Sequence, residues 1–302
     1  MANIGIIGSG NVGANTAFFL AEKAVGNVLL YDVQEGLAKG KALDMMEAAP
    51  VRGYKTTISG TEDRNDVFEC DVVIVSAGAV RTPGMKREDL YQSNRDMIVE
   101  YAHAMKGSGA KVIMVTEPVD LLTALFVRES GMKREQVLGL GGLLDSTRLR
   151  YMVAHELGVT MENVTANVIG RHAPGMIPLA KYTTVSGVPV DRLIAPERLS
   201  ELFERTRNAG DVIVDMAQRA NAYYGPSASA ADLAEAIRRD TGRIMPISLV
   251  LNGEFGVKGV AMSLPAVIGR NGVEQVLKPQ LTDEQLKQFT TSASELEQIL
   301  GK

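Results

Sequence analysis

The chain has 302 residues, of which 45% are hydrophobic and 23% are charged, and its formal net charge is −4. This composition is typical of a soluble globular protein, and the length allows two domains, each with a core of its own. No run of 18 or more apolar residues could span a bilayer and no basic stripe suggests nucleic acid, so we expect neither a membrane nor a nucleic acid as partner.

The amino terminus leads directly into a strand pattern, without the basic region and long apolar stretch of a signal peptide. We therefore expect a cytoplasmic protein. The single cysteine, Cys70, cannot form an intramolecular disulfide, and it precedes an apolar run in which a small hydrophobic side chain would be buried. We interpret it as a packing residue.

The first half of the chain alternates short Val- and Ile-rich runs with helix-like segments. The strand-like runs are NIGIIG, VLLYD, DVVIVSAG and VIMVT, and a helical pattern follows each of them. Parallel strands need crossover connections and are buried on both faces, which gives continuous apolar runs of this kind. The pattern predicts a doubly wound parallel sheet over residues 1–144.

The character of the sequence changes near residue 145. A helix is predicted from Asp145 to Leu157, where Gly158 ends it. The run NVTANVIG predicts a strand, VSGVPV predicts a turn with flanking strand residues, and residues 196–219 form a long amphipathic pattern. Such a helix could bury its apolar face against the sheet or against another subunit.

The last part of the chain has signals of hairpins and of a final helix. Asn-Gly pairs at Asn252 and Asn271 are typical of turns between antiparallel strands, and Thr282 with Gln285 has the spacing of a capping box. We therefore predict a second, α+β substrate domain over residues 145–302, packed closely against the first.

A glycine loop, GSGNVG, follows the first strand and opens the first helix. In this context the glycines allow a tight turn and a close approach of the backbone to a pyrophosphate at the helix amino end. Asp32 stands 19 residues after Gly13, where a carboxylate can bind ribose hydroxyls and would repel a 2′-phosphate. The loop predicts a Rossmann domain that binds NAD in preference to NADP, with contacts from Gly8, Ser9, Gly10, Asn11, Val12, Gly13 and Asp32.

Two arginines, Arg81 and Arg87, lie in the loop AGAVRTPGMKREDL, between a strand and a helix. Loop arginines are usually solvated, but ligands bind at the carboxyl ends of parallel strands, and a guanidinium can hold a carboxylate with two hydrogen bonds. Asp145 and Arg148 are three residues apart, so they share one face of a helix. They form either a surface ion pair or part of a site that also needs a histidine.

His172 is the histidine available for such a site, in the segment VIGRHAPGMIPL. The chain has only three histidines, and the other two, His103 and His155, lie within helical patterns. A lone histidine in an apolar stretch is more often structural than catalytic. Its interpretation therefore depends on the motifs around it.

Taken in order, these motifs resemble the lactate/malate dehydrogenase superfamily along essentially the whole chain, and most of all its bacterial, lactate-dehydrogenase-like malate dehydrogenases. The resemblance is carried by the glycine loop with Asp32 and by RTPGMKR, LDSTRLR, VIGRHAPGMIPL, NAYYGPSASA and the segments from VPVDRL to IGRNGVEQV. It implies NAD-dependent exchange of a hydride between malate and oxaloacetate, as in the tricarboxylic acid cycle, and a homodimer or homotetramer.

The resemblance also implies roles for individual residues. His172 matches the proton acceptor and donor, and Asp145 matches the carboxylate that orients it. Arg148 matches the anchor for the C1 carboxylate of the substrate, Arg87 the residue that polarises the reacting carbonyl, and Arg81 the residue that reads the distal carboxylate of malate. Oxidation of a 2-hydroxy acid needs a base that titrates near neutral pH, which histidine provides. No metal is part of the predicted site.

Asn94, Val115 and Glu117 match the family's other residues that contact the cofactor. The chain departs from the family pattern at two places. Glu117 stands where the family usually has an asparagine that holds the substrate oxygen, and Ala173-Pro174 stand where it usually has Gly-Asp. Glu117 could point at the substrate oxygen, be protonated by burial, or pair with an arginine. The departures leave two alternatives open: another 2-hydroxy acid dehydrogenase, or an NAD-binding paralogue with impaired catalysis.

Overall fold

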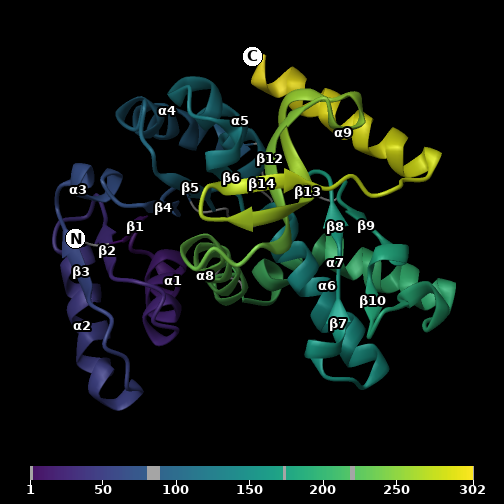
Figure 1. Cartoon of the computed structure of the whole chain (residues 1–302), viewed down its shortest axis with the longest axis horizontal. Helices are drawn as coiled ribbons and strands as arrows, with labels where there is room; N and C mark the ends of the chain where they lie inside the picture. Colours follow the sequence, from purple (N-terminus) through teal and green to yellow (C-terminus); the bar gives the residue numbers. More distant parts are fainter. Residues whose placement is uncertain (1–2, 80–88, 173–174, 218–221, 302) are drawn as a thin grey trace.

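A nine-stranded sheet runs through the computed structural model, which describes residues 3–79, 89–172, 175–217 and 222–301 (Figure 1). Its strand order is β14-β13-β12-β6-β5-β4-β1-β2-β3. The six strands from β3 to β6 are parallel, in the order 3-2-1-4-5-6 of doubly wound dinucleotide-binding domains. They are β1 (Ile4–Ile7), β2 (Val28–Tyr31), β3 (Ile58–Thr61), β4 (Val72–Val75), β5 (Lys111–Met114) and β6 (Val137–Gly139). The predicted fold of the amino-terminal half is confirmed.

Helices cover both faces of this parallel sheet, so its central strands are buried on both sides. Ile4, Ile6 and Ile7 of β1 are fully inaccessible to solvent. Helices α1 and α8 pack against each other on one side of the sheet, and α4 packs against α5 on the other (Figure 1). The helices of this half are α1 (Asn11–Glu22), α2 (Leu37–Arg52), α3 (Arg64–Phe68), α4 (Asp89–Ala104) and α5 (Val119–Ser130).

The antiparallel strands of the carboxyl-terminal half continue the same sheet. Strands β12 (Arg243–Asn252), β13 (Lys258–Gly269) and β14 (Gly272–Val276) form a meander, and β12 joins β6 through the pair Ser248 and Gly139. The helices of this half are α6 (Gly141–Leu157), α7 (Pro196–Ala217), α8 (Tyr224–Arg238) and α9 (Asp283–Leu300). Thr282 and Gln285 make the predicted capping box at the start of α9.

Short strands between α6 and α7 form two small sheets, and here one prediction was wrong. NVTANVIG is not one strand, because β7 pairs with β10 whereas β8 pairs with β9. The chain leaves the first ladder where the backbone N–H of Val168 donates to Ser146 Oγ of α6, at 2.9 Å. The small sheets comprise β7 (Val164–Thr165), β8 (Val168–Ile169), β9 (Ile177–Pro178), β10 (Thr184–Val185) and β11 (Val188–Pro189).

Two other boundaries differ from the sequence-based expectation. Helix α6 begins at Gly141, four residues before Asp145, so the aspartate lies in its second turn. In the hairpin of β13 and β14, Gly269 pairs with Gly272, so the turn residues are Arg270 and Asn271 and not the Asn-Gly pair.

The hydrophobic core extends across both halves of the chain. One cluster of buried side chains contains residues from Ile4 in β1 to Leu296 in α9, and a smaller one lies around α6 and α7. Burial raises the pKa of the Cys70 thiol to about 11, so the cysteine stays protonated at neutral pH, as expected of a packing residue. Among the described residues, no helix has the length and apolar character needed to cross a membrane.

Two glycines of the loop between β1 and α1 meet opposite steric conditions. A Cβ atom on Gly13 would lie 1.8 Å from the backbone oxygen of Gly8. A Cβ atom on Gly10 would have no atom within 4 Å, and the φ of Gly10 is −68°. Gly13 therefore allows helix and loop to touch, whereas Gly10 leaves open space in front of the amino end of α1.

We predict that Gly13→Ala lowers the free energy of unfolding by about 1–3 kcal/mol, because backbone atoms on both sides must move apart. Gly109→Ala is the matched control, because Gly109 is exposed outside the helices and a Cβ atom there would have no atom within 4 Å, and it should change this free energy by less than about 0.5 kcal/mol. Urea unfolding of the three proteins measures both effects. Equal losses of stability in the two variants would contradict this steric account.

Candidate active site

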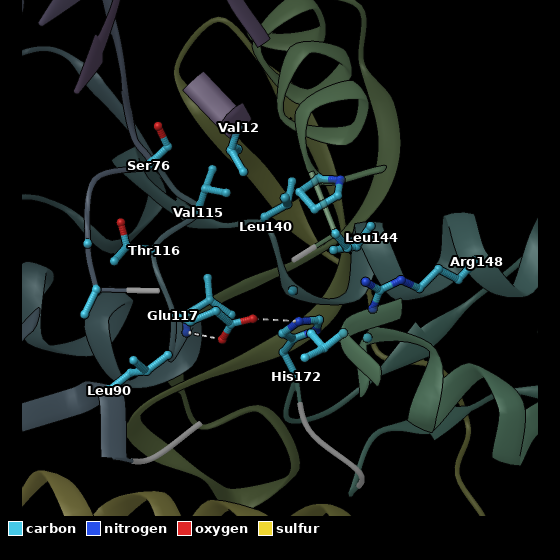
Figure 2. Close-up of a pocket in the computed structure, with 18 residues that line it drawn as sticks. Val12, Ser76, Leu90, Val115, Thr116, Glu117, Leu140, Leu144, Arg148 and His172 are labelled. Carbon is cyan, nitrogen blue, oxygen red and sulfur yellow. Dashed lines mark hydrogen bonds and ion pairs between the residues drawn. The ribbon is translucent and has the colours of Figure 1, made fainter. Parts of the chain in front are cut away.

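A pocket of about 210 Å³ opens at the carboxyl ends of β4, β5 and β6 (Figure 2). This edge of a doubly wound sheet is where ligands bind. Most of its lining is apolar, with a few polar groups that include Glu117, Arg148 and His172, as is usual for pockets that bind small molecules. Besides these, it is lined by Val12, Ser76, Gly78, Ala79, Leu90, Val115, Thr116, Val119, Leu140, Gly141, Leu144, Gly210, Val214, Ala222 and Pro226.

His172 is the buried histidine of this pocket. Its Nδ1 lies 2.7 Å from Asp145 Oδ2, and the exposed fractions of the two side chains are 4% and 1%. Burial by itself would lower the pKa of the imidazole. The charges of Asp145 and Glu117 and hydrogen bonds to both outweigh burial and raise the pKa to about 9. The predicted pairing of His172 with Asp145 is present, and it leaves Nε2 as the nitrogen that faces the pocket.

Asp120 in the first turn of α5 fixes the backbone at His172. Its Oδ2 accepts the His172 backbone N–H at 2.6 Å, and its Oδ1 accepts the Ser248 hydroxyl at 2.5 Å. Burial raises the pKa of Asp120 to about 6, although the hydrogen bond from Ser248 and the charge of His172 lower it. Our sequence analysis missed this residue. The available signal was an acidic residue at the start of the apolar run VDLLTALF.

Glu117 follows β5 and meets the other side of the imidazole. Its Oε1 lies 3.1 Å from His172 Nε2, and its Oε2 accepts the backbone N–H of Val119 at 3.2 Å. Figure 2 shows the carboxylate of Glu117 turned toward the ring of His172 and joined to it by a dashed line. The carboxylate therefore stands at the ring nitrogen that a substrate oxygen would approach.

Arg148 brings a positive charge to the same space. It lies one turn after Asp145 on α6, with Nη1 3.5 Å from Asp145 Oδ1, and its guanidinium extends toward His172 (Figure 2). The side chain is 14% exposed, so this is not the surface ion pair that the spacing alone allowed. Arg81, Arg87 and Ala173-Pro174 lie outside the described residues.

Asn94 and Val115 occupy different positions around the pocket. Val115 lines it, whereas Asn94 is 2% exposed and is not among its lining residues. The amide of Asn94 accepts the backbone N–H of Ala79 at 2.8 Å and donates to the backbone oxygen of Glu117 at 2.7 Å. In this structure Asn94 ties together the loops that follow β4 and β5.

The glycine loop fits a dinucleotide. Asp32 Oδ2 accepts the backbone N–H of Ser9 at 2.7 Å, which places its carboxylate beside the loop at the end of β2. Within the described part of the chain, no side chain caps the amino end of α1, and the space in front of Gly10 is open. The first N–H groups of α1 are thus directed at a space that a phosphate can enter. Within the same ranges no group of three His, Cys, Asp or Glu side chains could hold a metal ion.

A doubly wound sheet with such a glycine loop, next to a pocket lined by a buried histidine that an aspartate contacts from behind, defines the class of dehydrogenases that bind a nicotinamide dinucleotide. Residues 2–139 match the NAD-binding domain of lactate/malate dehydrogenase, and residues 143–302 match the alpha/beta carboxyl-terminal domain of the same enzymes. The chain belongs to the lactate/malate dehydrogenase family.

Individual relatives cover nearly the whole chain. A malate dehydrogenase of Desulforudis audaxviator is 40% identical over 299 residues, which is 98% of this chain and 97% of the relative. The structure of malate dehydrogenase from Picrophilus torridus has a TM-score of 0.94 and 35% identity. The match covers 100% of this chain and 97% of the Picrophilus chain. The structure of a lactate dehydrogenase from Cryptosporidium parvum, solved with lactic acid and NAD, also has a TM-score of 0.94 and 35% identity. The match covers 99% of this chain and 96% of that chain.

We predict that Asp120 makes stability depend on pH. Its pKa is about 6 in the folded protein and about 3.9 in an unfolded chain, so the folded state alone binds a proton between these values. The stabilisation is complete below about pH 4 and is lost as pH rises through 6. The unfolding free energy of the wild type, relative to that of Asp120→Asn, should therefore fall by on the order of 2 kcal/mol from pH 4 to 7.

Urea unfolding between pH 4 and pH 7 measures this difference in the free energy of unfolding. Asp232→Asn is the control, because the contribution of Asp232 should depend on pH in the opposite direction. Burial raises the pKa of Asp232, but Arg243 lowers it further, below its ordinary value. The stabilisation from Asp232 is therefore lost as pH falls. Parallel curves for the wild type and Asp120→Asn would contradict the prediction.

Proposed function

We propose that the chain is an NAD-dependent malate dehydrogenase that exchanges a hydride between malate or oxaloacetate and the cofactor. The observation that carries the proposal is the pairing of His172 Nδ1 with Asp145 Oδ2 at 2.7 Å, in a pocket that also holds Arg148. The malate dehydrogenase relatives, which match almost the full length, support the choice of substrate.

In this proposal His172 removes the hydroxyl proton of malate through Nε2 and returns it to oxaloacetate in the reverse direction. Asp145 holds the proton of Nδ1, fixes the ring orientation and stabilises the imidazolium, as the aspartate of a catalytic triad does. When bound, NAD accepts the hydride from the carbon that carries the hydroxyl. The apolar walls formed by Leu140, Leu144 and Val214 keep water away from these groups.

Arginines provide the charges that a dicarboxylate requires. Arg148 binds the C1 carboxylate, and its position on α6 beside Asp145 supports this role. For Arg87, which polarises the carbonyl, and Arg81, which reads the distal carboxylate, the proposal rests on the sequence resemblance. A neutral residue in place of Arg81 would favour a monocarboxylate such as lactate.

The cofactor lies along the glycine loop, with Gly8 to Gly13 at the pyrophosphate and Asp32 at the adenosine ribose. Glu117 and Val115 contribute on the nicotinamide side, and Asn94 supports them through its hydrogen bond to the backbone of Glu117. The cofactor-binding part corresponds to residues 1–144 and the substrate part to residues 145–302.

We further propose a cytoplasmic homodimer or homotetramer. The apolar side chains of Val212, Ile213 and Met216 on α7 are 48%, 40% and 80% exposed in the single chain. Contact between α7 and another subunit would remove this apolar surface from water. The remaining exposed surface would then be polar along most of this helix.

Steady-state kinetics with NADH and three 2-oxo acids test the proposed reaction. We expect a higher kcat/KM for oxaloacetate than for pyruvate or 2-oxoglutarate, because only oxaloacetate has the right length to bring a second carboxylate to the arginines. His172→Asn should lower kcat by about 10²–10⁴-fold while NADH affinity stays unchanged. A preference for pyruvate would favour a lactate-type enzyme, and NADH binding without turnover of any of the three would favour an impaired paralogue.

We predict that the protein binds NADH more tightly than NADPH, since the carboxylate of Asp32 repels a 2′-phosphate. Asp32→Ser should narrow this preference by about tenfold or more, which corresponds to about 1.4 kcal/mol. Fluorescence titration of both cofactors against both proteins provides the measurement. Asp66→Ser, at an exposed aspartate of α3, is the matched control and should leave the preference unchanged. Equal affinities in the wild type would show that Asp32 does not select the cofactor.

A further inference from the structure

Two carboxylates meet the two ring nitrogens of the one buried imidazole in the pocket. Asp145 Oδ2 lies 2.7 Å from Nδ1 of His172, and Glu117 Oε1 lies 3.1 Å from its Nε2. Asp145 is 1% exposed, whereas the side chain of Glu117 is 32% exposed. The imidazole is therefore bound on both sides, by a fixed inner acid and by an outer acid at the pocket mouth.

This arrangement determines how many protons the group must hold. An ionised carboxylate only accepts hydrogen bonds, and a neutral imidazole has a single N–H. Two ionised carboxylates, at 2.7 Å from Nδ1 and 3.1 Å from Nε2, therefore require the imidazolium form, with a proton on each ring nitrogen. The imidazolium also leaves each buried charge next to a partner of opposite sign.

The orientation of Glu117 is supported by its second oxygen. Oε2 accepts the backbone N–H of Val119 at 3.2 Å, which turns Oε1 toward the ring. The distance of 3.1 Å from Oε1 to Nε2 is that of a hydrogen bond. Any substrate oxygen that exchanges a proton with His172 must come equally close to Nε2. Glu117 and the substrate therefore compete for one N–H.

Further charged groups lie around His172, and they do not all act in the same direction. Asp120 of α5 binds the backbone N–H of His172, and Arg148 of α6 lies 3.5 Å from Asp145, whose charge it partly offsets. On the side of α9, Glu295 pairs with Arg171 at 2.9 Å. Among the described residues, the charged side chains that form a hydrogen bond or an ion pair with His172 are three acids, Asp120, Asp145 and Glu117.

We propose that Glu117 is an internal ligand of His172 Nε2, which keeps the imidazole protonated in the ligand-free enzyme and which the substrate oxygen displaces. The proposal rests on the proposed function, because it assigns the reacting proton to Nε2. In reduction, the oxaloacetate carbon receives the hydride of NADH and its oxygen receives the proton of Nε2, which leaves a neutral imidazole and malate. Glu117 therefore keeps the ligand-free enzyme in the protonated form that oxaloacetate reduction needs. Malate oxidation first requires loss of the Nε2 proton.

A titration of the histidines by NMR tests the first part without any turnover. The chain has only three histidines, so ring signals of protein labelled in histidine can be assigned by replacing His103 and His155 in turn with Gln. Glu117→Gln keeps a hydrogen-bond acceptor next to Nε2 but removes the charge. We expect the midpoint of His172 in the ligand-free variant to fall by about one pH unit or more. An unchanged midpoint would overturn the proposal.

Glu129→Gln is the matched control, because it removes the negative charge of a glutamate that lies next to a different histidine. Glu129 Oε2 lies 3.5 Å from Nε2 of His103 at the surface, outside the pocket. This variant should leave the His172 midpoint where it is in the wild type. A shift of the His172 midpoint as large as that in Glu117→Gln would overturn the assignment to the local contact.

The pH dependence of kcat/KM for malate at saturating NAD tests the second part, since this quantity reports the enzyme form that malate binds, before the substrate oxygen displaces Glu117. Malate needs the neutral imidazole, so the acidic limb in Glu117→Gln should move to lower pH by the same amount as the NMR midpoint. At pH 7 this corresponds to a gain of about tenfold per pH unit. An acidic limb that stays in place would overturn the proposal. If neither protein turns over malate at any pH, the proposed function fails, and the NMR titration still decides whether Glu117 keeps His172 protonated.

Discussion

The hydrogen bonds that hold His172 join the two halves of the chain at the candidate active site. The backbone N–H of His172 donates to Asp120 in the first half, and its ring contacts Asp145 at the start of the second. A buried imidazole next to buried carboxylates is stable only when each charge has a partner. The pocket therefore needs the parallel sheet, α5, α6 and the segment after β8 to lie in one fixed arrangement.

Much of the fold could be predicted because it follows from local patterns. The apolar runs of β1, β2, β4 and β5 are long enough to be recognised, and the parallel order follows from the helices between them. NVTANVIG was assigned to one strand because its pattern is continuous, whereas pairing with different partners depends on contacts such as that of Val168 with Ser146. The turn at Asn271 is displaced by one residue because the register of β13 and β14 is fixed by their ladder.

The site was less predictable than the fold. The pairing of His172 with Asp145 and the place of Arg148 were expected, because a helix fixes the spacing of Asp145 and Arg148 and the resemblance supplied the histidine. Asp120 was missed because its burial depends on Ser248, 128 residues later in the chain. The contact of Glu117 with Nε2 was not foreseen either, since the orientation of a carboxylate in a pocket depends on groups that are distant in sequence.

The seam between the parallel and antiparallel parts of the sheet connects the two halves physically. Strand β6 has β5 on one side and β12 on the other, where Gly139 pairs with Ser248. A fragment that ended at residue 144 would leave the backbone groups of β6 on that side open to water and to other chains. Open edges of this kind invite aggregation and strand exchange. The nucleotide-binding half is thus a poor module for transplantation into other proteins, and any recombination of this enzyme with a relative should keep β6, α6 and β12 together.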